Sequence, residues 1–144
     1  MNNYLEQLFD NGYVEKEVDI IPKKLIAILR TINGEDQLEV ERSMSVVEGS
    51  RAYVLHEYSI RLLSRTLIEY KAIKFKDFVD AETYIRKLPS LLIEKLILEQ
   101  NILDKELANE LNLERVEKSF FGQKPAEQES EQSLEGSTPG KEDL

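Results

Sequence analysis

The residues that could carry out acid–base or nucleophilic chemistry are few and scattered in this chain. The sequence contains one histidine, His56, and no cysteine. A catalytic histidine normally activates a neighbouring nucleophile and is itself oriented by a third group. Neither partner can be identified around His56, which lies between Leu55 and Glu57. We therefore predict that His56 is a surface or boundary residue and that the chain has no catalytic residue.

The acidic residues and glycines do not form a recognisable metal or cofactor motif. No segment has the calcium-loop pattern of acids at alternating positions ending in Glu. An acidic chain contains close carboxylates by chance, here Glu39 with Glu41 and the series Glu127, Glu129 and Glu131. The six glycines are scattered, so no glycine-rich phosphate loop is present. We predict no metal, no cofactor and no enzymatic activity.

The composition also restricts the partners. The 144 residues are 41% hydrophobic and 33% charged, with a formal net charge of -9. Nucleic acids and anionic membranes attract clustered Lys and Arg, and the lysines between residues 71 and 76 are too few in such a chain. The N-terminus has no basic region followed by an apolar run, as a signal peptide would. We expect a cytoplasmic protein that binds neither nucleic acid nor membrane.

The first third of the chain contains a helix pattern followed by strand patterns. Residues 2–11 place apolar side chains on one helical face, and Gly12 is a typical helix stop. From Val14 to Ile20, apolar and charged residues alternate with the period of a half-buried strand. A second apolar run, 25–32, follows the turn at Pro22. A helix over 23–32 is the rival interpretation, but we favour a β-hairpin near 14–32.

The rest of the domain is predicted to be helical. Asn33 is the expected N-cap of a helix over 35–45, and a second, longer helix is predicted over 51–70. An extended linker, a short helix over 80–88 capped by Asp80, and a helix over 90–112 capped by Ser90 complete the set. The predicted fold class is α+β and predominantly α: a small N-terminal β-hairpin followed by a four-helix domain, within residues 1–116. Residues 117–144, with seven acids and three lysines, are predicted to be a disordered acidic tail.

Two apolar features could contact a partner. The last predicted helix carries a long stripe that includes Ile93, Ile97, Leu103 and Leu107. The stripe is either entirely core or in part a docking face for a partner helix. The pair Phe120 and Phe121 precedes the tail and either folds back onto the domain or inserts into a partner.

The order of elements over about 23–112 resembles that of known assembly proteins. An apolar run is followed by Arg30 and an acidic helix start, then by a long helix, a lysine-rich segment, and a short helix closing at Pro89. The stretches that carry the resemblance are Leu25–Asp36, Arg61-Leu62-Leu63, Tyr70-Lys71-Ala72-Ile73, Leu88-Pro89 and Leu91–Leu96. Together they resemble the tail assembly chaperones and baseplate hub assembly proteins of contractile-tailed bacteriophages.

This resemblance implies a non-enzymatic role in the host cytoplasm. The implied function is an assembly factor that chaperones a tape-measure or baseplate hub protein while the tail is built. The alternative is a permanent structural subunit of the phage baseplate or tail. A third interpretation is a regulatory adaptor of the host cell that binds a helix through the same stripe. The implied partner is a phage tail or baseplate protein, and a homo-oligomer is compatible with each interpretation.

Overall fold

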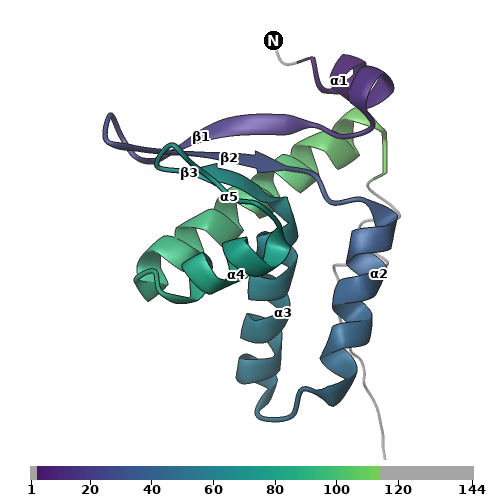
Figure 1. Ribbon diagram of the computed structural model, residues 1–144. Helices are drawn as coiled ribbons and strands as arrows, with labels where there is room; N and C mark the ends of the chain where they lie inside the picture. Colours follow the sequence, from purple (N-terminus) through teal and green to yellow (C-terminus); the bar gives the residue numbers. More distant parts are fainter. Residues whose placement is uncertain (1–2, 114–144) are drawn as a thin grey trace, which may run out of the picture. The chain divides into compact units, whose positions relative to one another are not determined.

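A computed structural model of the chain describes residues 3–113, of which 3–105 belong to one compact unit and 106–113 to a second. Among the described residues, the first unit holds a four-stranded sheet and every helix except the C-terminal end of the final one (Figure 1). In chain order the elements are α1 (Tyr4–Asn11), β1 (Glu15–Ile21), β2 (Leu25–Arg30), α2 (Gly34–Ser43), the 3-10 helix η1 (Met44–Val46), α3 (Arg51–Thr66), β3 (Leu67–Tyr70), β4 (Ile73–Lys74), α4 (Phe78–Arg86) and α5 (Ser90–Glu110).

The sheet is a meander in which each strand pairs antiparallel with the next, in the order β1-β2-β3-β4. Alternate residues such as Val18, Ala27 and Leu29 are buried on one face, on the side where α3, α4 and α5 lie (Figure 1). The other face carries exposed side chains such as Glu17 and Ile26. Because one face of the sheet is buried and the other is exposed to solvent, apolar and charged residues alternate along β1.

The predicted hairpin is confirmed, and residues 25–30 form a strand rather than a helix. Val18 lies opposite Ala27, and Glu15 lies opposite Arg30. The backbone N–H of Lys24 donates to the carbonyl of Ile21, which closes the turn around Pro22. β-branched side chains and the alternation on β1 therefore outweigh the helix preference of Leu and Ala in the second run.

The prediction for residues 67–76 is wrong. The expected helix over 51–70 ends at Thr66, and Leu67–Tyr70 is strand β3, which pairs with β2. The expected linker contains β4, so the predicted small hairpin is half of a four-stranded sheet. A bulge explains the error: the register shifts between the pairs Ile28–Glu69 and Leu29–Leu67. The extra residue places Leu67 and Tyr70 on the same buried face, which imitates helical spacing.

Helices α2, α3 and α4 each begin after a residue whose side chain accepts a hydrogen bond from a backbone N–H of the first turn, as expected for an N-cap. The side chain of Asn33 accepts a hydrogen bond from the N–H of Asp36 at 2.7 Å, as predicted. Ser50 caps α3 in the same way by accepting from Tyr53. The prediction that Asp80 caps the short helix is wrong, because Asp77 is the cap and accepts from the N–H of Asp80.

The core of the first unit forms where α3, α4 and α5 meet the covered face of the sheet. Its largest fully buried side chains include Leu29, Leu63, Tyr70, Ile85 and Leu96. The fold is therefore α+β and mostly helical, as predicted. The predicted tail, 117–144, lies outside the described residues. Among the helices of residues 3–113, none is long and apolar enough to cross a membrane.

Candidate partner-binding site

The residues predicted to contact a partner fall in different environments. Ile93 and Leu103 are part of the core, and the side chain of Leu103 is completely buried. Ile97 is half-buried and lies at the edge of the core. Leu107 is on the same helix but belongs to the second unit. Phe120 and Phe121 lie outside the described residues. For Ile93 and Leu103 the structure favours the core interpretation of the stripe.

The exposed apolar residues of α5 lie on the opposite side of the helix from the core. Leu91, Leu98 and Ile102 expose 75%, 52% and 36% of their surface. Their spacing of seven and four residues places them on one outward-facing stripe, which we call the outer α5 face. The helix therefore has an apolar stripe on each side. Since the inner stripe already supplies the core, the outer face is free to meet another molecule.

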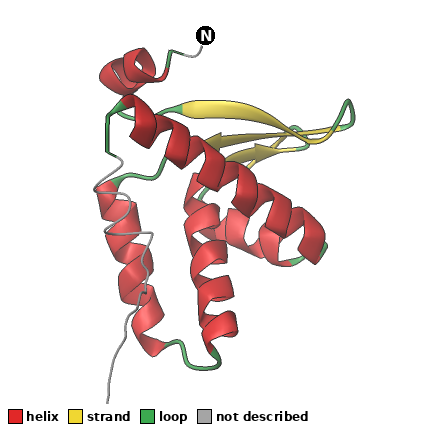
Figure 2. Cartoon of the chain, turned by 180° about the vertical axis from the view of Figure 1, so that it is seen from behind, coloured by secondary structure: helices red, strands yellow, loops and turns green. Residues whose placement is uncertain are grey.

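A shallow groove lies between α5 and the end of α3 that leads into the sheet. Figure 2 shows α5 crossing this end of α3. Its volume is about 60 Å³. Its walls are apolar and come from Leu62 and Leu63 of α3, Ile97 of α5 and Ile32 before α2. The space accepts one side chain rather than a helix, so the groove supplements the outer α5 face.

Polar groups close one end of the groove. The side-chain amide of Gln100 donates to the carbonyl of Arg30 at 3.0 Å and to the carboxylate of Asp104 at 3.2 Å. The amide oxygen of Gln100 is buried and accepts no hydrogen bond among the described residues. Although Asp104 as a residue is exposed, desolvation of its carboxyl group raises its pKa to about 6. Asp104 is therefore the acceptor that the groove can offer to a donor from outside, because the amide oxygen of Gln100 is buried.

The sequence contained a signal for this polar end that our prediction did not use. Ile93, Leu96, Leu103 and Leu107 recur at spacings of three, seven and four, and Gln100 divides the spacing of seven into four and three. A polar residue inside an apolar repeat needs partners for its amide, which the structure supplies only in part. The roles of Gln100 and Asp104 were therefore missed.

A second polar cluster joins α2, α3 and α4. The carboxylate of Glu57 on α3 accepts two hydrogen bonds from Arg86 of α4, at 2.7 and 3.0 Å. Arg61 lies 3.3 Å from the same carboxylate and donates to the carbonyl of Ser43 at the end of α2. The hydrogen bonds from Arg86 hold the pKa of Glu57 below its usual value. These contacts fasten both neighbouring helices to α3.

The pocket next to this cluster is structural. It has a volume of about 200 Å³ and is lined in part by Arg61, Arg65 and Phe78. Arg65 pairs with Asp36 and Glu39 of α2, both at 2.8 Å, and its guanidinium stacks over the ring of Phe78 at 3.5 Å. Because both arginines already face carboxylates, the pocket has no spare positive charge for an anion.

His56 is exposed on α3, in agreement with the prediction of a surface histidine. Within residues 3–113, no three His, Asp or Glu side chains are placed to hold a metal ion together. Comparison with known proteins gave no matching family model, no matching curated protein and no matching solved structure. The outer α5 face and the α3–α5 groove are thus the strongest candidates for a functional surface in the described part of the chain.

Proposed function

We propose that this chain is a non-enzymatic assembly factor that binds an apolar helix of a partner protein. The observation that carries the proposal is the outer α5 face, where Leu91, Leu98 and Ile102 lie exposed on a helix whose opposite side already fills the core. Two helices bury such stripes by packing side by side. The adjoining groove adds a pocket in which one side chain of the partner can be anchored.

The partner we propose is a tape-measure or baseplate hub protein of a contractile-tailed bacteriophage. This part of the proposal rests on the order of elements over about 23–112, and it sets the site of action in the host cytoplasm. A chaperone of this kind covers apolar helices of its client until they reach their place in the tail. The net charge of -9 supports that role, since it keeps the chaperone and a bound client dispersed.

Co-expression tests the proposal. The candidate tape-measure or hub protein is produced with and without this chain, and its soluble fraction is measured together with co-purification. We expect the chain to raise client solubility, and the variant Leu91→Gln/Leu98→Gln to lose this effect. The matched control is Leu38→Gln on α2, a residue that is equally exposed but belongs to another surface. Circular dichroism establishes that all variants are folded.

The outcomes separate the alternatives. If Leu38→Gln abolishes solubilisation while the double α5 variant retains it, the binding surface is wrong. If the client gains no solubility and purified phage particles contain the chain in stoichiometric amounts, the chain is a permanent baseplate or tail subunit. If the chain self-associates and Leu91→Gln/Leu98→Gln disperses it, the outer α5 face is an interface between copies of this chain.

A further inference from the structure

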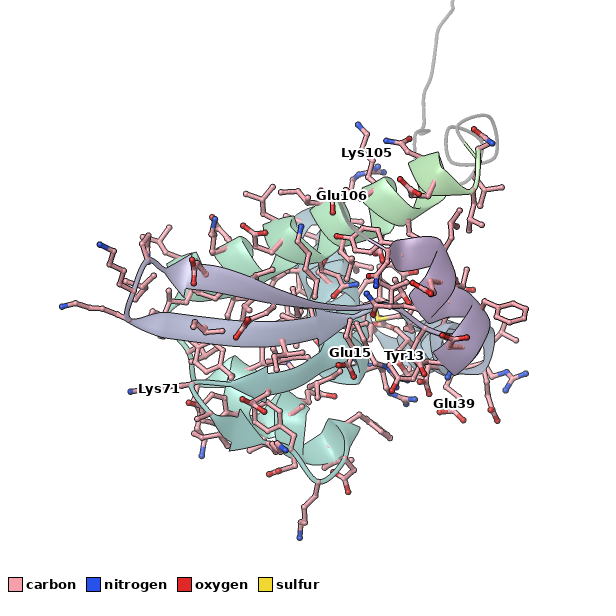
Figure 3. The ribbon with its side chains drawn as sticks, turned by 90° about the horizontal axis from the view of Figure 1, so that it is seen from above. Tyr13, Glu15, Glu39, Lys71, Lys105 and Glu106 are labelled. Carbon is pink, nitrogen blue, oxygen red and sulfur yellow. The ribbon has the colours of Figure 1, made fainter. Side chains whose placement is uncertain are left out.

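The two turns at one end of the sheet bring four lysines together. Lys23 and Lys24 belong to the β1–β2 turn, Lys71 opens the β3–β4 turn, and Lys74 lies at the end of β4. The turns are neighbours because the backbone N–H of Lys71 donates to the carbonyl of Ile26, at 3.0 Å. In Figure 3, Lys71 points away from the sheet at this end. We call these four residues the basic tip.

The basic tip contrasts with the rest of this acidic chain. All four lysines are exposed, and within residues 3–113 the ion pairs involve other side chains. The acids that face the tip from the strands are Asp19, which lies opposite Ile26, and Glu69, which lies opposite Lys74. Within the sheet, the four positive charges of the tip therefore lie near two negative ones, on a protein whose net charge is -9.

Two of the lysines occupy backbone positions that normally select glycine or asparagine. Lys23 follows Pro22 with a φ of 65°, as at the third position of a type II turn. Lys71 and Ala72 have φ values of 55° and 66°, as in a type I′ hairpin turn. A side chain with a Cβ in this left-handed region costs about 1 kcal/mol. The chain thus keeps lysine at two positions where folding favours another residue.

Apolar side chains are interleaved with the lysines. Ile21, Ile26 and Ile73 expose about two fifths of their surface each beside the two turns, but only Ile26 lies on the open face of the sheet, since Ile21 and Ile73 lie opposite the buried Leu25 and Tyr70. A phosphate backbone offers no apolar groups to such isoleucines, whereas a peptide with both carboxylates and apolar side chains matches charge and surface together. The chemistry of the tip therefore favours an acidic, partly apolar polypeptide over nucleic acid, and the net charge of -9 disfavours the extended negative surface of an anionic membrane.

We propose that the basic tip is a binding surface for an acidic, partly apolar segment of another polypeptide. The lysines attract its carboxylates, and Ile26 on the open face contacts its apolar side chains. This surface is separate from the outer α5 face, so the proposal does not depend on the function proposed above.

The test uses the full chain and a fluorescein-labelled peptide of about twelve residues built from Glu-Glu-Leu repeats, with binding followed by fluorescence anisotropy. We expect binding that weakens with added salt. The variant Lys23→Asn/Lys71→Asn removes two charges and relieves the left-handed strain. It should therefore melt at an equal or higher temperature but bind the peptide at least about fivefold more weakly. A purely structural role for the lysines predicts no loss of binding.

Two matched variants complete the design. Lys23→Arg/Lys71→Arg keeps the charge and the strain, so its affinity should stay within about twofold of the unchanged chain. Lys87→Gln/Lys105→Gln removes the same charge from α4 and α5, away from the two turns, and should also bind normally. If the α4/α5 variant weakens binding as much as the tip variant, net charge rather than the tip governs affinity and the proposal fails.

The same assay detects other ligands of the basic tip. If single-stranded oligonucleotide or phosphatidylglycerol vesicles bind the tip more tightly than the peptide, the ligand class is wrong. The chain's own acidic segment is tested with the full-length variant Glu127→Gln/Glu129→Gln/Glu131→Gln. Tighter peptide binding by that variant would mean that this segment competes for the tip, which overturns the assignment to another polypeptide.

Discussion

Replacing Glu57 by glutamine should destabilise the domain far more than any surface charge. The Glu57 side chain is 8% exposed and is held by Arg86 and Arg61, from α4 and α3. Removing one partner of a fully buried ion pair typically costs about 3–5 kcal/mol. The arginines here are 36% and 24% exposed and can turn partly towards water. We therefore expect Glu57→Gln to lower the free energy of unfolding by about 2 kcal/mol at neutral pH.

Glu82 provides the matched control. It pairs with the same Arg86 at 2.7 Å, but its side chain is 29% exposed. Glu82→Gln should therefore cost about 0.5 kcal/mol, as solvent-screened pairs do. Urea denaturation followed by circular dichroism measures both variants against the unchanged chain. Equal losses for the two variants would refute the argument that burial of Glu57 makes its ion pairs important.

The pH dependence gives an independent check on the same residue. The pKa of Glu57 is lowered in the folded state, so its carboxylate stabilises the fold above the unfolded value of 4.5. That contribution is lost as the pH falls below 4.5 and through the lowered folded pKa. The difference between the unchanged chain and Glu57→Gln should therefore be constant near neutrality and shrink in acid. A difference independent of pH would mean that packing of the glutamine, rather than the lost charge, causes the effect.

Three further substitutions test local features by the same denaturation assay. Gly49→Ala should lower the free energy of unfolding by about 1–2 kcal/mol, because φ is +142° and the new Cβ would lie 2.9 Å from the Tyr53 ring. Gly34→Ala is the control and should be tolerated, since no atom lies within 4 Å of its Cβ. Ala72→Gly should stabilise by about 0.5–1 kcal/mol by relieving its positive φ; a loss of stability would contradict the strain. The pKa of Asp104 is raised to about 6, so its charge destabilises the fold as the pH rises from about 4 through 6. Asp104→Asn should therefore stabilise by about 1 kcal/mol or less at pH 7 after allowance for solvent screening, and by nothing near pH 4.

Local signals were enough to predict the first hairpin and, apart from the end of α3 and the cap of α4, the helices. The alternation over 14–20, the Asn33 cap and the stop at Gly12 are each decided by residues within a few positions of one another. Strand β3 was different. Its bulge places Leu67 and Tyr70 three residues apart on one face, and the partner that makes it a strand, β2, lies about forty residues earlier in the chain. No local pattern contains that pairing.

The same limit applies to the candidate surfaces. The stripe of Ile93, Ile97, Leu103 and Leu107 was recognised as apolar, but periodicity alone could not say which side of α5 meets the sheet. Once the sheet is in place, Ile93 and Leu103 are buried and Leu91, Leu98 and Ile102 are exposed. The basic tip was out of reach for the same reason, because Lys23 and Lys71 become neighbours only if residues 67–70 form a strand.

Different residues account for the stability of this domain and for its candidate functions. Glu57 and its arginines, together with core residues such as Leu96 and Leu103, hold the helices and the sheet together. The exposed leucines of the outer α5 face contribute little to folding and carry the proposed association. The turn lysines carry a backbone cost that asparagine or glycine would remove. Stability alone would favour glycine or asparagine in the turns, whereas solubility would favour polar residues on the outer α5 face. Keeping leucine and lysine there is therefore the physical reason to look for partners at these two surfaces first.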